Sequence, residues 1–139
     1  MNLKPAYEYL NKPHRIELRI RRLMYRREAL LSCLLPKGLK PKIVQVQESA
    51  PGDKMADVMV EVKDIEDEVE RLSWEKVEAI QDTIRTISRL ESDAERTVLM
   101  GFYIARRPMT ELAEELHYSE RSAFRLKRKA LENITRLIA

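Results

Sequence analysis

The feature that most restricts the fold is a stretch, residues 56–90, that contains neither proline nor glycine. Apolar residues recur in it at intervals of three and four, a spacing that places side chains on one face of an α-helix. They are Val58, Val62, Ile65, Val69, Leu72, Ile80, Ile84 and Ile87. The stretch predicts one helix of about 35 residues with a narrow apolar seam, which is longer than a globular domain usually needs and is typical of coiled-coil packing.

A second amphipathic helix is expected nearer the N-terminus, from about Tyr7 to Leu35. Its apolar residues recur at steps of three, four and seven: Ile16, Ile20, Leu23, Leu30 and Leu34. The two helices could pack as an antiparallel hairpin, the long helix could pair with a second copy of the chain, or both contacts could form. Because Ser73 and Lys76 interrupt the long seam, we expect imperfect packing there.

Four arginines of the first helix share one of its faces, because they follow one another at intervals of four, three and four residues. They are Arg15, Arg19, Arg22 and Arg26. One interpretation is a solvated face that pairs with acidic side chains of the next helix, and the other is a surface that contacts nucleic-acid phosphates. We favour the pairing with acids, and the sequence leaves both open.

The segment between these helices, PKGLKPKIVQVQESAPGDK from Pro36 to Lys54, contains three prolines and two glycines. The residue before a proline is biased away from helix, so the segment is expected to be a linker or mobile loop. Within it IVQVQ alternates weakly like a strand, but no partner strand is evident and we expect irregular backbone.

Composition supports an all-α fold. Of the 139 residues, 44% are hydrophobic, 35% are charged and only three are glycine, a balance that suits long solvated helices better than a sheet sandwich. The length allows one modest core rather than two large ones. We expect a helical hairpin or coiled coil in residues 1–90, with a flexible linker at about residues 36–55, and a second domain in residues 91–139.

Charge is distributed unevenly along the chain. Residues 1–42 carry 11 basic and 3 acidic residues, residues 43–95 carry 6 and 15, and residues 96–139 carry 9 and 5. A polyanion could engage either basic end, whereas the acidic middle would repel it.

Several function classes find no support in the residues. The single cysteine, Cys33, leaves no disulfide within the chain, and with two histidines it makes no ordinary zinc site, so we expect no metal and no other cofactor. No glycine-rich phosphate loop, nucleophile elbow or distinctive pair of acids is present, and we expect no enzymatic activity.

The N-terminus, MNLKPAYEYL, lacks the apolar run of a signal peptide, and no stretch approaches the roughly 20 apolar residues of a membrane span. A soluble cytoplasmic protein without a membrane partner is expected.

Three helix starts are predicted in the C-terminal part. Ser92 and Glu95 have the spacing of a capping box, in which each side chain satisfies the other residue's backbone N–H. The helix that follows has an apolar stripe and is broken at Arg106-Arg107-Pro108. Thr110 is then expected to cap a short helix, TELAEEL, and Ser119 to cap a final helix that extends to about Ile138.

The last two helices have the pattern of a helix-turn-helix, which needs a small residue where the helices cross and apolar residues on either side. Ala113 is the small residue, Leu112 and Leu116 flank it, and Tyr118 follows the turn, while the inward residues of the second helix are Ala123, Leu126 and Ala130. The turn position usually given to glycine is His117, which must tolerate or avoid a left-handed conformation.

The opposite side of the last helix has the features of a surface that recognises DNA. It presents Glu120, Arg121, Ser122, Phe124, Arg125 and Arg128. In the major groove arginine can bind guanine bidentately, glutamate can accept from cytosine and phenylalanine can contact the thymine methyl. The other basic residues of this part, Lys127, Lys129, Arg106 and Arg107, are expected to contact phosphates. An ordinary helical hairpin with a basic surface is the alternative.

A resemblance to known families follows from these residues. The run from Ser92 to Leu131, SDAERTVLMGFYIARRPMTELAEELHYSERSAFRLKRKAL, resembles the C-terminal promoter-binding domain of bacterial sigma factors. With KDIEDEVERLSWEKVEAIQDTI before it, the segment ELHYSERSAFRLKRKAL is similar to sigma-like bacteriophage late regulators of the ArpU and RinA type, over nearly the whole chain. The resemblance implies that Glu120, Arg121, Phe124 and Arg125 face the bases. Phe124 departs from the sigma pattern, in which a polar or basic residue is common, so a different target sequence is expected.

The expected function is therefore a phage-encoded, sequence-specific transcriptional regulator that binds double-stranded DNA in the bacterial cytoplasm. Its long helices would mediate oligomerisation or contact with host RNA polymerase. Because one small module makes few base contacts, at least a homodimer is expected, with the seam between Val58 and Ile87 as the contact. The alternatives are an antiparallel hairpin that fills this seam, a DNA-packaging subunit resembling small terminases, and a coiled-coil scaffold that binds protein.

Overall fold

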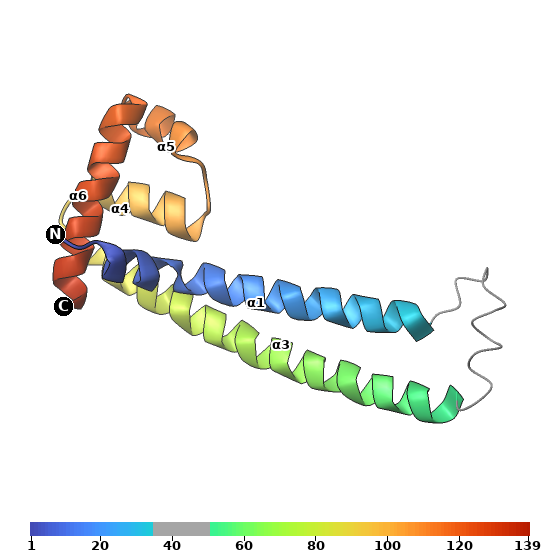
Figure 1. The fold of residues 1–139 in the computed structure, drawn as a ribbon. Coiled ribbons are helices and arrows are strands. Elements are labelled where there is room, and N and C mark those ends of the chain that lie inside the picture. The colour runs from blue at the N-terminus through green and yellow to red at the C-terminus, as the bar shows by residue number, and fades with distance from the viewer. Residues whose placement is uncertain (35–50) are drawn as a thin grey trace. The chain divides into compact units, whose positions relative to one another are not determined.

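The computed structural model describes residues 1–34 and 51–139, and every regular element in these residues is a helix (Figure 1). The elements are α1 (Lys4–Leu34), α3 (Pro51–Ser88), α4 (Asp93–Leu99), the π-helical turn η2 (Met100–Ile104), α5 (Met109–Leu116) and α6 (Glu120–Ile138). The prediction of an all-α fold is confirmed for this part of the chain.

The long helix α3 begins earlier than its apolar pattern predicts. It starts at Pro51 rather than near residue 56, so the last residues of the expected linker are helical. Proline is well suited to the first turn of a helix because an N–H at that position has no acceptor within the helix. Asp53 adds a negative charge at the positive end of the helix dipole. The predictions for residues 36–50, including the irregular IVQVQ, lie outside the described residues.

The chain forms two compact units, and α1 and α3 each contribute to both. One unit is Ile16–Glu75, and the other combines Met1–Arg15 with Lys76–Ala139. This division differs from the expected boundary near residue 90. Its physical reason is the apolar N-terminus, since Leu3, Ala6 and Leu10 are buried in one cluster with residues of the C-terminal helices.

In the unit Ile16–Glu75, α1 and α3 are antiparallel. Arg19 lies 3.9 Å from Glu68. Arg26 and Arg27, further along α1, pair with Glu61 and Glu66, which both come before Glu68 in α3, and the Arg27 bond is 2.9 Å long. The interpretation that the arginine face pairs with acids therefore applies to Arg19 and Arg26. The buried apolar residues of this unit are Ile16, Val62, Ile65 and Leu72.

The burial of these seam residues within a single chain favours the hairpin alternative for this part of the seam. The predicted dimer contact uses the same residues of α3. In this unit the antiparallel α1 of the same chain lies beside α3 instead. The oligomeric state itself stays a prediction.

The core of the unit Met1–Arg15 with Lys76–Ala139 joins all four C-terminal elements to the start of α1. It contains Leu3, Ala6, Leu10, Ile87, Leu90, Val98, Leu99, Tyr103, Met109, Leu112, Ala113, Ala123, Ala130, Leu131 and Ile134. The Tyr9 hydroxyl connects the start of α1 to the last turns of α3. It donates to the Asp82 carboxylate at 2.6 Å and lies 2.6 Å from the Thr86 hydroxyl. The core thereby supplies a fixed base for α5 and α6.

Candidate nucleic-acid interface

The start of α4 confirms one half of the predicted capping box and corrects the other. The Ser92 hydroxyl accepts from the Glu95 N–H at 3.2 Å, as expected. The Glu95 carboxylate, however, accepts from Asn133 Nδ2 of α6 at 2.6 Å instead of reaching back to Ser92. Glu95 is only 6% exposed, and a buried carboxylate without a donor would be costly, so the amide of Asn133 determines its orientation.

Between α4 and α5 the chain makes a π-helical turn, which the sequence did not indicate. Ala105 N–H bonds Met100 O at 3.0 Å and Arg107 N–H bonds Gly101 O at 2.9 Å. Arg106 then has a positive φ of 58°, which ends the helix where the Arg106-Arg107-Pro108 break was predicted. This turn carries Gly101 against α5, where a Cβ would lie 2.4 Å from Leu112 Cδ2.

The predicted cap of α5 is wrong. The helix begins at Met109, and the capping position is Pro108 rather than Thr110. The Pro108 carbonyl accepts from Glu111 N–H at 3.2 Å and Leu112 N–H at 3.3 Å, so the backbone supplies the first helical bonds without a hydroxyl. The earlier start also makes Met109 helical, and its side chain is buried in the core.

The connection between α5 and α6 is a left-handed turn at His117, with φ 58° and ψ 40°. His117 N–H bonds Glu114 O at 3.1 Å, and Tyr118 N–H bonds Ala113 O at 2.9 Å. These two bonds are those of the Schellman motif, in which glycine is the usual left-handed residue. Ser119 then caps α6 by accepting from Ser122 N–H at 3.1 Å, which confirms the predicted cap.

The inward residues of the two helices are largely as expected. Leu112, Ala113, Ala123 and Ala130 are buried, and Leu116 and Leu126 are partly buried against the same core. Tyr118, which follows the turn, is 42% exposed and does not belong to this core. Small residues on both helices let α5 and α6 approach closely and thereby determine which side of α6 remains outside.

The outer side of α6 presents the predicted base-contacting residues. All six are exposed: Glu120, Arg121, Ser122, Phe124, Arg125 and Arg128. Phe124 is 52% exposed, an unusual position for a large apolar side chain. Within residues 1–34 and 51–139, neither Arg121 nor Arg125 pairs with a carboxylate, whereas Arg128 lies 3.7 Å from Glu132.

Of the four residues predicted to contact phosphates, two are exposed and two make contacts within the chain. Lys129 and Arg106 are exposed. Arg107 pairs with Glu111 at 3.1 Å and with Glu115. Lys127 is partly buried: its Nζ lies 3.8 Å from the centre of the Phe102 ring, and burial lowers the pKa of this ammonium. An attraction to the aromatic face, rather than an exposed position on α6, accounts for its orientation.

Residues 40–135 match the model of a family described as a protein of unknown function, DUF1492. The chain belongs to this family. No curated protein and no solved structure matches the chain.

The matched range includes α3, α4, η2 and α5 entirely, and α6 as far as residue 135. Every residue of the exposed α6 side therefore lies within the family's range. None of the helices described is both long and apolar enough to cross a lipid bilayer. Among residues 1–34 and 51–139, the His, Cys, Asp and Glu side chains form no group that could hold a metal ion.

Sequence reasoning missed two contacts that position this surface, Glu95 with Asn133 and Gly101 with Leu112. Both join residues of different helices, so neither has a local signature. The available signals were a glycine inside an otherwise apolar helical pattern, which can mark a close approach, and a glutamate in a helix's first turn. Neither identifies the partner residue.

Proposed function

We propose that this chain is a sequence-specific DNA-binding protein that places α6 in the major groove. The observation that carries the proposal is the pair of exposed arginines, Arg121 and Arg125, which stand one turn apart on α6 and lack a carboxylate partner in the described residues. Cations without partners on one helix face attract a polyanion, and arginine there can bind guanine O6 and N7 together.

The surroundings of these arginines support the proposal. Ser119 stabilises the first turn of α6, and the closely packed α5 supports the opposite side of that helix. Glu120 could accept from cytosine N4, and the exposed Phe124 ring offers an apolar contact for a thymine methyl. Such a set can distinguish base pairs, whereas a uniformly basic surface could only bind the backbone.

The biological role that we propose is transcriptional regulation, by a sigma-like protein of bacteriophage origin that acts at a promoter or operator. Support for this finer statement is the resemblance of residues 92–131 to the promoter-binding domain of sigma factors. Host RNA polymerase and a second copy of the chain are the proposed protein partners. A DNA-packaging subunit and a protein-binding scaffold are the other outcomes that the experiments below separate.

Selection of bound sequences from a random duplex pool is the decisive test. We expect enrichment of one short site and salt-dependent binding to random duplex. Arg125→Ala should weaken binding to the selected site by about 1 to 3 kcal/mol, which is about 5- to 150-fold, and relax the preference at one base pair.

Arg125→Lys is the matched control, because it keeps the charge and loses the bidentate geometry. It should lose the base preference and keep binding to random duplex. Equal losses by Arg125→Ala on selected and random duplex would instead make Arg125 a phosphate contact. Absence of salt-dependent duplex binding would leave the scaffold. Activation of a reporter from the selected site would distinguish a regulator from a packaging subunit.

A further inference from the structure

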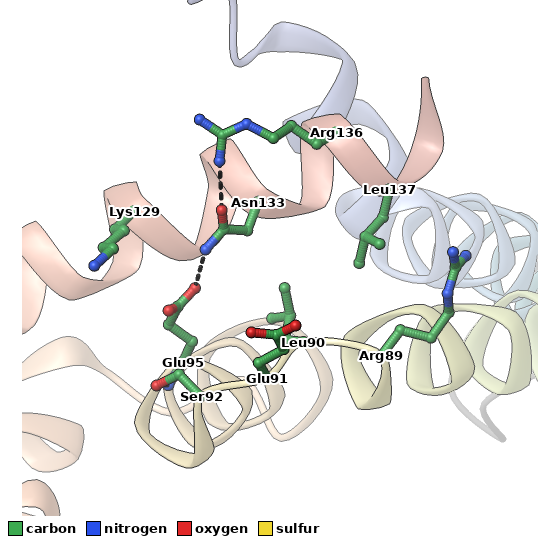
Figure 2. A pocket seen from close by; sticks show the side chains of 9 residues that line it. All are labelled: Arg89, Leu90, Glu91, Ser92, Glu95, Lys129, Asn133, Arg136 and Leu137. Carbon is green, nitrogen blue, oxygen red and sulfur yellow. Dashed lines mark hydrogen bonds between the residues drawn. The ribbon is translucent and has the colours of Figure 1, made fainter.

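A cleft of about 570 Å³ lies beside the C-terminal half of α6, where that helix faces the end of α3 and the start of α4 (Figure 2). Arg89 and Leu90 follow the last residue of α3, while Lys129, Asn133 and Arg136 come from α6. Figure 2 shows Lys129 and Arg89 toward opposite ends of the opening, with Asn133 between them. All these residues belong to the same compact unit.

The cleft has three cations, Arg89, Lys129 and Arg136, and none of them has a carboxylate partner in the described part of the chain. Arg136 donates to Asn133 Oδ1 at 2.5 Å, and Asn133 in turn donates to Glu95, so a neutral amide separates the guanidinium from that acid. By contrast, Arg96 and Arg107, elsewhere in the same unit, both pair with acids. The cleft therefore keeps a local excess of positive charge that an anion could neutralise.

The basic side of α6 continues into this cleft. Arg121, Arg125 and Lys129 follow at intervals of four residues, and Arg136 comes two turns later, so all four share one broad face. Helix α6 has 19 residues and is about 28 Å long, whereas the major groove is about 12 Å wide. If its first turns contact base edges, the turns from Lys129 onward must lie at the sugar–phosphate backbone.

We infer that this cleft binds backbone phosphates of the duplex whose bases α6 contacts, with Arg89, Lys129 and Arg136 as the phosphate ligands. The inference rests on the proposed DNA-binding function and extends it to residues that follow α3. Because Arg89 and Lys129 stand at different ends of the opening, the arrangement fits successive phosphates of one strand better than a single free anion. Glu91 and Glu95 also line the cleft, and both carboxylates oppose the bound strand.

The salt dependence of binding to random duplex tests the assignment, because each phosphate contact contributes about 0.9 to the slope of log K against log salt. Arg89→Gln and Lys129→Gln should each reduce the slope by about 1. Arg85→Gln and Lys12→Gln are the matched controls, since both residues are exposed and neither lines the cleft. They should leave the slope unchanged.

Glu91→Gln adds a test that a folding defect cannot imitate, because removal of the opposing charge should tighten duplex binding by several-fold. Slopes of the cleft variants equal to those of the controls, with intact binding by the unmodified protein, would overturn the cleft assignment alone. Absence of salt-dependent binding by the unmodified protein would overturn the proposed function and the cleft assignment together.

A titration with inorganic phosphate distinguishes a site for the DNA backbone from a site for a free anion. The readout is the change in amide chemical shifts of the cleft residues. A backbone site should show only weak, unsaturated shifts at millimolar phosphate. Saturable shifts confined to the cleft residues would show a site for a free anion and overturn the assignment to DNA.

Discussion

Replacement of Gly101 by alanine should destabilise the unit that carries α6, although alanine ordinarily favours a helix. The added Cβ would lie 2.4 Å from Leu112 Cδ2 and 3.3 Å from Leu112 Cδ1. Carbon atoms pack best at about 3.5 to 4.0 Å, so the two groups overlap severely. Leu112 is only 1% exposed, and its side chain has no open solvent into which it can rotate.

The magnitude follows from two opposing contributions. Overpacking of a filled core costs about 1 to 3 kcal/mol. Replacing glycine with alanine within a helix returns about 0.5 to 1 kcal/mol, because glycine loses more backbone entropy on folding. The difference is a loss of about 0 to 2.5 kcal/mol. We therefore expect Gly101→Ala to lower the free energy of unfolding by about 1 kcal/mol, as measured by urea denaturation with far-UV circular dichroism.

A double-mutant cycle with Leu112→Ala provides the control. That substitution removes the atoms that overlap and by itself costs about 2 to 5 kcal/mol. In its background Gly101→Ala should become stabilising by about 0.5 to 1 kcal/mol, since only the helix preference remains. A stabilising Gly101→Ala in the unmodified protein, or an equal loss in both backgrounds, would refute the close approach of η2 and α5.

Three further predictions concern the same unit. His117→Gly should raise the free energy of unfolding by about 0.5 to 1 kcal/mol, because glycine has no Cβ and adopts the left-handed conformation without steric cost. A lower urea midpoint for this variant would instead indicate a stabilising contact of the imidazole. Burial raises the pKa of the Tyr103 phenol above 10.0, so above that pH the folded chain keeps a proton that the unfolded chain loses. The contribution of this phenol to the free energy of unfolding is complete below pH 10 and declines above it. Tyr103→Phe should therefore show a smaller loss of stability in alkaline denaturation. Lys127→Gln should leave the salt slope of duplex binding unchanged, since the ammonium lies over Phe102, whereas a reduced slope would return Lys127 to the phosphate contacts.

The helices themselves follow from the sequence because their signals are local. Residues 56–90 lack proline and glycine and have apolar residues at helical spacing, which indicates α3 without any knowledge of its neighbours. Ser119 indicates the start of α6 because its hydroxyl accepts from the N–H of Ser122, three residues further on. The same periodicity separates the buried Ala123 and Ala130 from the exposed Arg121 and Arg125. Residues of one helix keep a fixed angular relation, and so the candidate DNA-binding side could be predicted.

Tertiary contacts decided what the local pattern left open. An apolar seam specifies only that it must be buried, and it was the position of α1 that covered Val62 and Ile65 within the unit Ile16–Glu75. Lys127 and Lys129 are the same residue type two positions apart, yet only the structure shows that Phe102 lies where the first can reach it. Likewise, the Glu95 carboxylate bonds Asn133 rather than its own helix end because a residue 38 positions away lies closer in space. Such choices depend on distances between segments remote in the chain, and no spacing along the sequence encodes them.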